Sequence, residues 1–170
     1  LYSHLLDSLA VVNPLKTVLG NRGEPHPRVL DVGSGAGLPG VILAICLPEV
    51  EVTCVDTVGK KAAFIQQVAL GLGLRNLKAV HARVETLTSG DWDVVCSRAF
   101  ASLVDFTRWS RAALKPNGLW MAMKGKHPSD ELTALGAEVQ MFHVEQLNVP
   151  GLEAERCLLW LRPIANGTAG

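Results

Sequence analysis

Four glycines follow directly on an apolar run early in the chain, and their spacing suits the binding of a ligand. Residues 28–40 read Arg-Val-Leu-Asp-Val-Gly-Ser-Gly-Ala-Gly-Leu-Pro-Gly. Glycine adopts backbone conformations that other residues avoid, and it lets a ligand lie against bare backbone. Beyond Gly40 the apolar spacing becomes helical. The stretch predicts a strand, a ligand-binding turn and a helix, although a glycine-rich connection without a ligand is the alternative.

Two carboxylates near this turn narrow the choice of ligand. Residues 35–40 match the pattern Gly-x-Gly-x-x-Gly of dinucleotide folds. Asp31 precedes the glycines, where it would repel a pyrophosphate and attract a cation, or would cap backbone amides. Asp56 follows the next apolar run, where a carboxylate either accepts both hydroxyls of a ribose or serves as a turn residue. S-adenosylmethionine, with an ammonium, a sulfonium and no phosphate, fits these positions better than NAD.

Polar residues at two further strand ends extend the candidate site. Val84 and Glu85 follow the predicted strand at 77–81, where they would flank an adenine or belong to an ordinary loop. Arg98 follows the predicted strand at 92–96, where it would contact cofactor or substrate or lie on the surface. Because the carboxyl ends of parallel strands meet at one edge of a sheet, we expect these residues near the glycine turn.

The rest of the chain predicts strands that alternate with helices. The expected strands cover residues 28–32, 51–55, 77–81, 92–96 and 119–123, and the main helices cover 40–47, 59–72 and 103–114, the last closed by a turn at 115–118. Two strand-like runs at 139–144 and 157–161 lack a long helix between them, which indicates an antiparallel pair. We predict an α/β, Rossmann-like fold: a mostly parallel twisted sheet with helices on both faces and a C-terminal antiparallel hairpin.

Length and composition indicate a single domain with a real core. The chain has 170 residues, of which 48% are hydrophobic and 19% charged, and no apolar run is long enough to span a membrane. The four cysteines lie far apart within apolar runs, which predicts core residues rather than a metal or redox site. The chain starts at Leu1 inside a helical pattern that Pro14 interrupts. We therefore expect one domain over 1–170, with 1–27 the remnant of a truncated N-terminal helical region.

The net charge of zero conceals one basic segment. Between Arg98 and Lys126 six basic residues accompany a single acid, Asp105. Such a segment either meets a polyanion or forms a solvated helix face whose counter-charges lie elsewhere.

Several motifs together resemble a known family of enzymes. The glycine stretch, Asp56 and the turn at 114–118 resemble class I S-adenosylmethionine-dependent methyltransferases. A closer resemblance is to the RsmG (GidB) family, whose members methylate N7 of a guanine in the decoding-region loop of 16S ribosomal RNA. It rests on His-Leu-Leu-Asp-Ser at 4–8, Val-Gly-Ser-Gly-Ala-Gly-Leu-Pro-Gly at 32–40, Val-Asp-Thr-Val-Gly-Lys-Lys at 55–61, Ser-Arg-Ala-Phe-Ala-Ser-Leu at 97–103 and Met-Lys-Gly at 123–125.

The resemblance implies the following site and partners. The family's cofactor contacts fall on Gly33, Leu38, Val84, Glu85 and Arg98, and Asp56 takes the ribose position of the wider class. No catalytic acid or base is expected, because guanine N7 carries a lone pair and no proton. Lys124 and Lys126 are the expected contacts to RNA. The implied partner is small-subunit ribosomal RNA or a ribosomal particle in the cytoplasm, without a metal or a membrane.

Three alternatives remain at this point. A class I methyltransferase that acts on a small molecule or on another RNA would share every cofactor residue. A nicotinamide-dependent reductase would share the glycine turn. An RNA-binding module without catalytic activity would share the basic segment.

Overall fold

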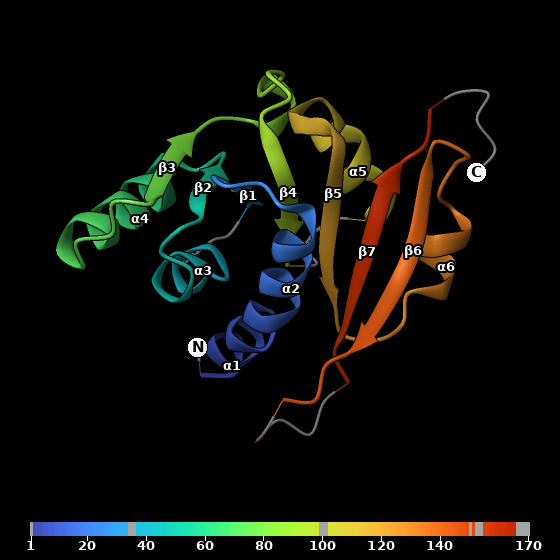
Figure 1. The fold of residues 1–170 in the computed structure, drawn as a ribbon, viewed down its shortest axis with the longest axis horizontal. Coiled ribbons are helices and arrows are strands. Elements are labelled where there is room, and N and C mark those ends of the chain that lie inside the picture. The colour runs from blue at the N-terminus through green and yellow to red at the C-terminus, as the bar shows by residue number, and fades with distance from the viewer. Residues whose placement is uncertain (1, 34–36, 99–101, 150, 152–154, 166–170) are drawn as a thin grey trace.

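A seven-stranded sheet with the strand order β3-β2-β1-β4-β5-β7-β6 forms the centre of the computed structural model (Figure 1). The structure describes residues 2–33, 37–98, 102–149, 151 and 155–165. The strands are β1 (Arg28–Val32), β2 (Glu51–Asp56), β3 (Leu77–His81), β4 (Trp92–Ser97), β5 (Leu114–Lys124), β6 (Val139–Gln146) and β7 (Cys157–Pro163). The helices are α1 (Tyr2–Ala10), α2 (Val12–Arg22), α3 (Gly40–Cys46), α4 (Gly59–Gly71), α5 (Leu103–Ser110) and α6 (Ser129–Thr133), with short 3₁₀ turns η1 (Val84–Thr86) and η2 (Arg111–Ala113).

The strand pairing confirms the predicted architecture. β1 runs parallel to β2 and β4, β3 runs parallel to β2, and β5 runs parallel to β4. β7 lies between β5 and β6 and is antiparallel to both, which is the expected C-terminal hairpin. Strands β1 to β5 therefore end at one edge of the sheet, where β7 begins. We call this the carboxyl edge.

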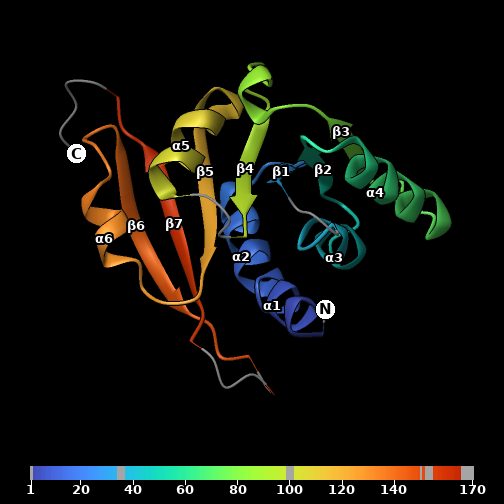
Figure 2. The ribbon, with the colours of Figure 1, turned by 180° about the vertical axis from the view of Figure 1, so that it is seen from behind.

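Helices cover both faces of the sheet, and each face has its own core (Figures 1 and 2). On one face, α2, α3 and α4 pack on strand residues such as Val29 and Trp160. On the other face, α5 and α6 pack on the alternate strand residues, such as Leu30 and Trp120. Successive side chains of a strand point to opposite faces, so each strand contributes to both cores.

The N-terminal helical pattern divides close to the predicted break. The first helix ends at Ala10, and α2 begins after Val11. Pro14 lies in the first turn of α2, where a backbone N–H has no partner within the helix, so proline is tolerated there. None of the helices in the described part of the chain combines the length and apolar character that crossing a membrane requires.

The region around Pro116 differs from the prediction. The expected helix at 103–114 ends at Ser110, and the expected turn at 115–118 lies inside β5 as a bulge. Trp92 pairs with Leu114 and Val94 with Leu119, so four residues of β5 face Asp93 alone. Asp93 is 1% exposed and accepts hydrogen bonds from the Lys115 ammonium at 3.1 and 3.2 Å. A buried carboxylate requires such partners, and they hold the bulge in place.

The cysteine prediction is confirmed in part. Cys54, Cys96 and Cys157 are buried core residues, and all four thiols are free. Cys46, the last residue of α3, is exposed, so the prediction of a core position was wrong there. An apolar sequence context does not distinguish the buried face of a short helix from its exposed end.

Candidate functional site

The glycine turn joins the end of β1 to the start of α3 at the carboxyl edge. The Gly33 amide donates to the Val55 carbonyl of β2 at 2.8 Å. Gly33 and Gly37 have positive φ angles of 65° and 90°, which favour glycine. Residues 34–36, including Gly35 of the predicted ligand-binding turn, lie outside the described residues. Of the described ends of the turn, Gly33 is exposed beside β1 and β2, whereas Gly37 is buried.

The Asp31 side chain of β1 holds the far end of this turn, at the start of α3. Its carboxylate is fully buried, and Oδ2 accepts the Gly40 amide at 2.8 Å. A carboxylate at a helix N-terminus also interacts favourably with the helix dipole. The predicted amide-capping role is therefore present, whereas a cation contact of Asp31 stays a prediction. Burial, and after it the nearby charge of Asp31, raises the pKa of the Cys96 thiol well above its usual range.

Asp56 ends β2 at the neighbouring position of the same edge. It is 6% exposed, and its Oδ1 accepts the Val58 amide at 2.8 Å. The turn role considered for this residue is thus observed. A carboxylate has two oxygens and about four lone-pair sites, so this bond leaves acceptor capacity for ribose hydroxyls.

The other predicted cofactor residues lie in the connections that leave the carboxyl edge. Leu38 is buried in the glycine turn. Val84 and Glu85 begin η1 after β3, with Val84 buried in the sheet core and Glu85 exposed. Arg98 directly follows β4 and is partly buried. The structure therefore brings all six predicted cofactor residues to one edge, from the ends of four adjacent strands.

Glycine is required by the close packing at two described positions of this edge. A Cβ atom added to Gly37 would lie 2.6 Å from Val41 Cγ2, and one added to Gly40 would lie 2.8 Å from Asp31 Oδ2. Side chains at these positions would force the turn apart, so the close approach of backbone depends on glycine. With the carboxylate of Asp56 beside it, this turn fits S-adenosylmethionine.

A cavity of about 300 Å³ lies farther along the same edge, beyond β4. His4 and Asp7 of α1 contribute to it, together with Arg98, Lys124 and Arg156. The Arg156 guanidinium Nε donates to both Asp7 carboxylate oxygens at 3.1 and 3.2 Å. Sequence reasoning missed this pair, although the motif at 4–8 contains His4 and Asp7. The motif at 4–8, which lies far from the glycines in sequence, was the signal that could have pointed to this cavity.

The two predicted RNA contacts have different environments. Lys124 is 8% exposed, and its Nζ donates to Glu131 Oε1 of α6 at 3.0 Å. Glu131 Oε1 also accepts the Leu103 amide at 3.0 Å, so it joins α6 to the start of α5. Lys126 is exposed in the loop after β5.

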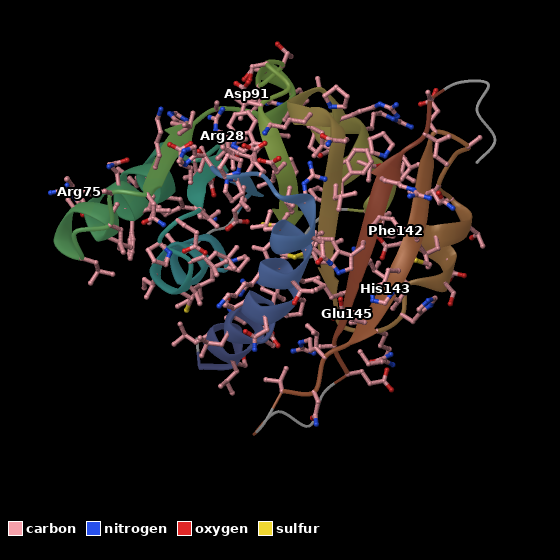
Figure 3. The ribbon with its side chains drawn as sticks, in the orientation of Figure 1. Arg28, Arg75, Asp91, Phe142, His143 and Glu145 are labelled. Carbon is pink, nitrogen blue, oxygen red and sulfur yellow. The ribbon has the colours of Figure 1, made fainter. Side chains whose placement is uncertain are left out.

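Elsewhere in the basic segment, Lys115 is paired with carboxylates. Lys115 pairs with Asp93 and Glu24 at the opposite, amino edge of the sheet. Figure 3 shows Arg28 and Asp91 close together at that amino edge, where Arg28 Nη1 lies 3.4 Å from the Asp91 carboxylate. A larger cavity of about 490 Å³, between α5 and the start of β6, contains none of the predicted site residues. The predicted site residues lie instead at the carboxyl edge or in the connections that leave it.

Solved structures with a similar fold include several methyltransferases. TrmN from Thermus thermophilus matches with a TM-score of 0.65 and 22% identity, over 87% of this chain and 48% of that chain. An S-adenosylmethionine-dependent methyltransferase from Aquifex aeolicus matches with a TM-score of 0.63 and 16% identity, over 90% of each chain. At these identities the likeness defines the fold, which is that of class I methyltransferases.

Sequence relatives define the family within this class. Residues 1–159 match the family GidB, described as rRNA small subunit methyltransferase G, and the chain belongs to this family. Ribosomal RNA small subunit methyltransferase G of Acidovorax sp. (strain JS42) is 66% identical over 167 residues, which cover 95% of this chain and 74% of the relative. The protein of the same description from Polaromonas naphthalenivorans (strain CJ2) is 67% identical over 163 residues, which cover 95% and 73%.

Proposed function

We propose that this protein transfers the methyl group of S-adenosylmethionine to N7 of a guanine in the decoding-region loop of 16S ribosomal RNA. It is an S-adenosylmethionine-dependent methyltransferase of the GidB family. The observation that carries the proposal is the convergence of all six predicted cofactor residues at the carboxyl edge of a chain that belongs to this family. We further propose that residues 1–170 act as one methyltransferase domain.

Five of the six predicted cofactor residues have a stated contact in this proposal. The Asp56 carboxylate accepts the ribose hydroxyls, and the backbone at Gly33 and Leu38 lies against the methionine part. Val84 and Glu85 flank the adenine. When bound, the cofactor supplies an electrophilic methyl group on a positively charged sulfur.

The residues of this chain have little proton chemistry to perform. Guanine N7 presents a lone pair at the major-groove edge of the base and carries no proton at neutral pH. The reaction thus requires no general base, and the contribution of the protein is to align N7 with the methyl group. Methylation leaves a positive charge on the base. Lys124 and Lys126 contact RNA phosphates, which adds a sequence-independent attraction.

The proposal is tested with small ribosomal subunits from cells that lack the corresponding gene. Purified protein and methyl-labelled cofactor are incubated with whole subunits, with deproteinised 16S RNA and with a pool of small metabolites. Mass-spectrometric mapping of the RNA is expected to find one methyl group on a guanine N7 in the decoding-region loop. Label in metabolites alone, or on another atom or region of the RNA, would contradict the proposal. The first two reactions also distinguish free RNA from the assembled particle as substrate.

A further inference from the structure

The 300 Å³ cavity beyond β4 shares Arg98 with the predicted cofactor site and extends away from the glycine turn toward β7. Five separate parts of the chain line it: α1, the residue after β4, the end of β5, the residue after β6 and the start of β7. In the strand order β1-β4-β5-β7, three strand spacings of about 4.8 Å separate β7 from β1, which carries the glycine turn. The cavity is therefore placed to receive a part of the substrate rather than the cofactor's adenosine.

Cations dominate the lining of this cavity. Arg98, Lys124 and Arg156 line it, whereas Asp7 is the lining carboxylate. Asp7 is already paired with Arg156 Nε, and Glu131 of α6 pairs with Lys124. Within the described residues, the buried Arg98 Nη1 has no hydrogen-bond acceptor. A buried guanidinium nitrogen without an acceptor is costly, and a ligand that supplies an oxygen removes this cost.

The pKa of His4, which lines the cavity, reflects the electrostatic potential there. The charge of Arg98 is the main cause that lowers the pKa of the His4 imidazole below its ordinary value of 6.5. Arg156 acts in the same direction, and Asp7 opposes it. A site that disfavours an added proton on imidazole favours an anion.

The methylated base that the proposed reaction produces is a poor occupant of this cavity. Guanine methylated at N7 is cationic, so the guanidinium of Arg98, which no carboxylate of the described residues pairs with, would repel it. A phosphate group has the opposite charge and several acceptor oxygens. Arginine forms paired, charge-assisted hydrogen bonds to such oxygens, and its five N–H donors allow Arg98 to serve both cofactor and phosphate.

We propose that this cavity binds a backbone phosphate of the RNA substrate, held by Arg98, Lys124 and Arg156. The inference rests on the proposed function for its source of phosphate. The phosphate thereby sets the position of the attached nucleotide, whose base lies toward the glycine turn. Arg156 and Lys124 are positioning residues for the methyl transfer, and the cofactor carboxylate is the competing oxyanion that the experiments must separate.

The first test uses inorganic phosphate and needs no enzymatic activity. Sodium phosphate is titrated into the wild-type protein at constant ionic strength and pH, and the imidazole resonances of His4 are followed by NMR. We expect a saturable shift of the His4 signals and no comparable shift for His127, which is exposed outside the cavity. Equal, unsaturated shifts at both histidines would overturn the proposal. Titration in saturating S-adenosylmethionine then separates the sources, because a cofactor carboxylate in the cavity would abolish the shift.

The second test compares charge removal inside and outside the cavity. Arg156→Gln is expected to raise KM for RNA about tenfold or more, since a charge-assisted hydrogen bond to phosphate is lost. The Kd for S-adenosylmethionine should stay within about twofold, and the salt dependence of RNA binding should fall by about one phosphate contact. Lys124→Gln should act in the same direction. Arg75→Gln is the matched control, because Arg75 is exposed before β3, away from the carboxyl edge (Figure 3).

A paired variant guards against misfolding. Arg156→Gln alone leaves the buried Asp7 carboxylate without its guanidinium, whereas Asp7→Asn with Arg156→Gln removes both charges. If the double variant keeps the wild-type KM for RNA, or loses cofactor affinity as strongly as RNA affinity, the phosphate site is wrong. Wild-type protein that shows the His4 shift but methylates no ribosomal RNA would instead overturn the proposed function.

Discussion

The hydrogen bond from Gly40 to Asp31 connects the first strand of the sheet to the helix beyond the glycine turn. Asp31 is fully buried, so its carboxylate has few alternatives to the Gly40 amide. The Cys54 thiol packs against the same glycine. The pattern in the sequence predicted a glycine turn with a nearby carboxylate. It could not decide between a cation contact and an amide cap, because both need the same residue at the same place.

Gly40→Ala should disrupt the cofactor site. The added Cβ would meet Asp31 Oδ2 at 2.8 Å and would also press on the Cys54 thiol, so α3 must move. We expect a loss of about 1–3 kcal/mol in the free energy of unfolding, the usual cost of overpacking, and a Kd for S-adenosylmethionine raised about tenfold or more. Calorimetric titration and chemical denaturation measure the two effects.

Gly20→Ala provides the control for this substitution. Gly20 lies in α2, and an added Cβ meets nothing within 4 Å. Alanine in a helix should stabilise the protein by about 0.5–1 kcal/mol and leave cofactor affinity unchanged. If both alanine variants behave alike, the close packing at Gly40 has no role in the site.

The pKa of His4 offers a second test at the residue scale. The Arg98 charge lowers this pKa below 6.5, so the folded protein favours neutral imidazole. The resulting contribution to stability is present above pH 6.5 and is lost as the pH falls below it, because the unfolded chain then binds the proton more readily. NMR titration of Arg98→Gln should give a higher His4 pKa than the wild type. An unchanged value would show that Arg98 does not set the potential at the cavity.

At the scale of elements, the strands were predicted well where an apolar run has clear polar boundaries. The prediction at 77–81 coincides with β3, and that at 92–96 falls one residue short of β4. The error at 115–118 has a tertiary cause. Lys-Pro-Asn-Gly is a strong local turn signal, but the buried Asp93 carboxylate draws Lys115 into a bulge within β5. No local pattern reveals a partner 22 residues away.

The Asn76 side chain, directly before β3, connects to the end of α3, and these contacts give a prediction at the scale of elements. Its side-chain amide donates to the carbonyls of Ala44, Leu47 and Val50, at 2.9, 3.2 and 2.9 Å. These carbonyls lie at the end of α3 and in the connection to β2. Asn76→Asp removes the donors and places a charge beside the carbonyl oxygens. The free energy of unfolding should fall by about 1–3 kcal/mol, as measured by chemical denaturation.

Asn13→Asp is the matched control for this change. Asn13 is exposed in the first turn of α2, where a negative charge is favourable to the helix dipole. Its stability should be equal to that of the wild type or slightly higher. A similar loss in both variants would mean that the three carbonyl contacts of Asn76 do not stabilise the connection.

At the scale of the whole molecule, the sequence predicted the sheet, the terminal hairpin and the edge at which the predicted cofactor residues meet. The 300 Å³ cavity was not predicted, because its walls come from α1, β5, β7 and the residues that follow β4 and β6, which no spacing in the sequence connects. Lys124 was predicted as an RNA contact without its partner Glu131, which belongs to a different element. Ion pairs between residues of different elements are therefore the part of this site that the sequence alone could not predict.

Binding of the cofactor should stabilise the whole fold. A ligand that binds only the folded state at 100 times its Kd adds about 2.7 kcal/mol to the free energy of unfolding. For a chain of this length that corresponds to a rise in Tm of about 5–10 °C. Thermal unfolding with S-adenosylmethionine should show this rise. The same concentration of NAD should not, and an equal rise with NAD would favour a dinucleotide site.

The ion pair between Asp7 and Arg156 has a consequence for the order in which the protein is completed. The two residues lie 149 positions apart in the chain, and Arg156 directly precedes the last strand. During synthesis from the N-terminus, the strands that carry the predicted cofactor contacts emerge long before this arginine. A growing chain can thus assemble the glycine turn early, but it cannot close the cavity until its final strand has left the ribosome. The proposed phosphate site is therefore completed later than the glycine turn.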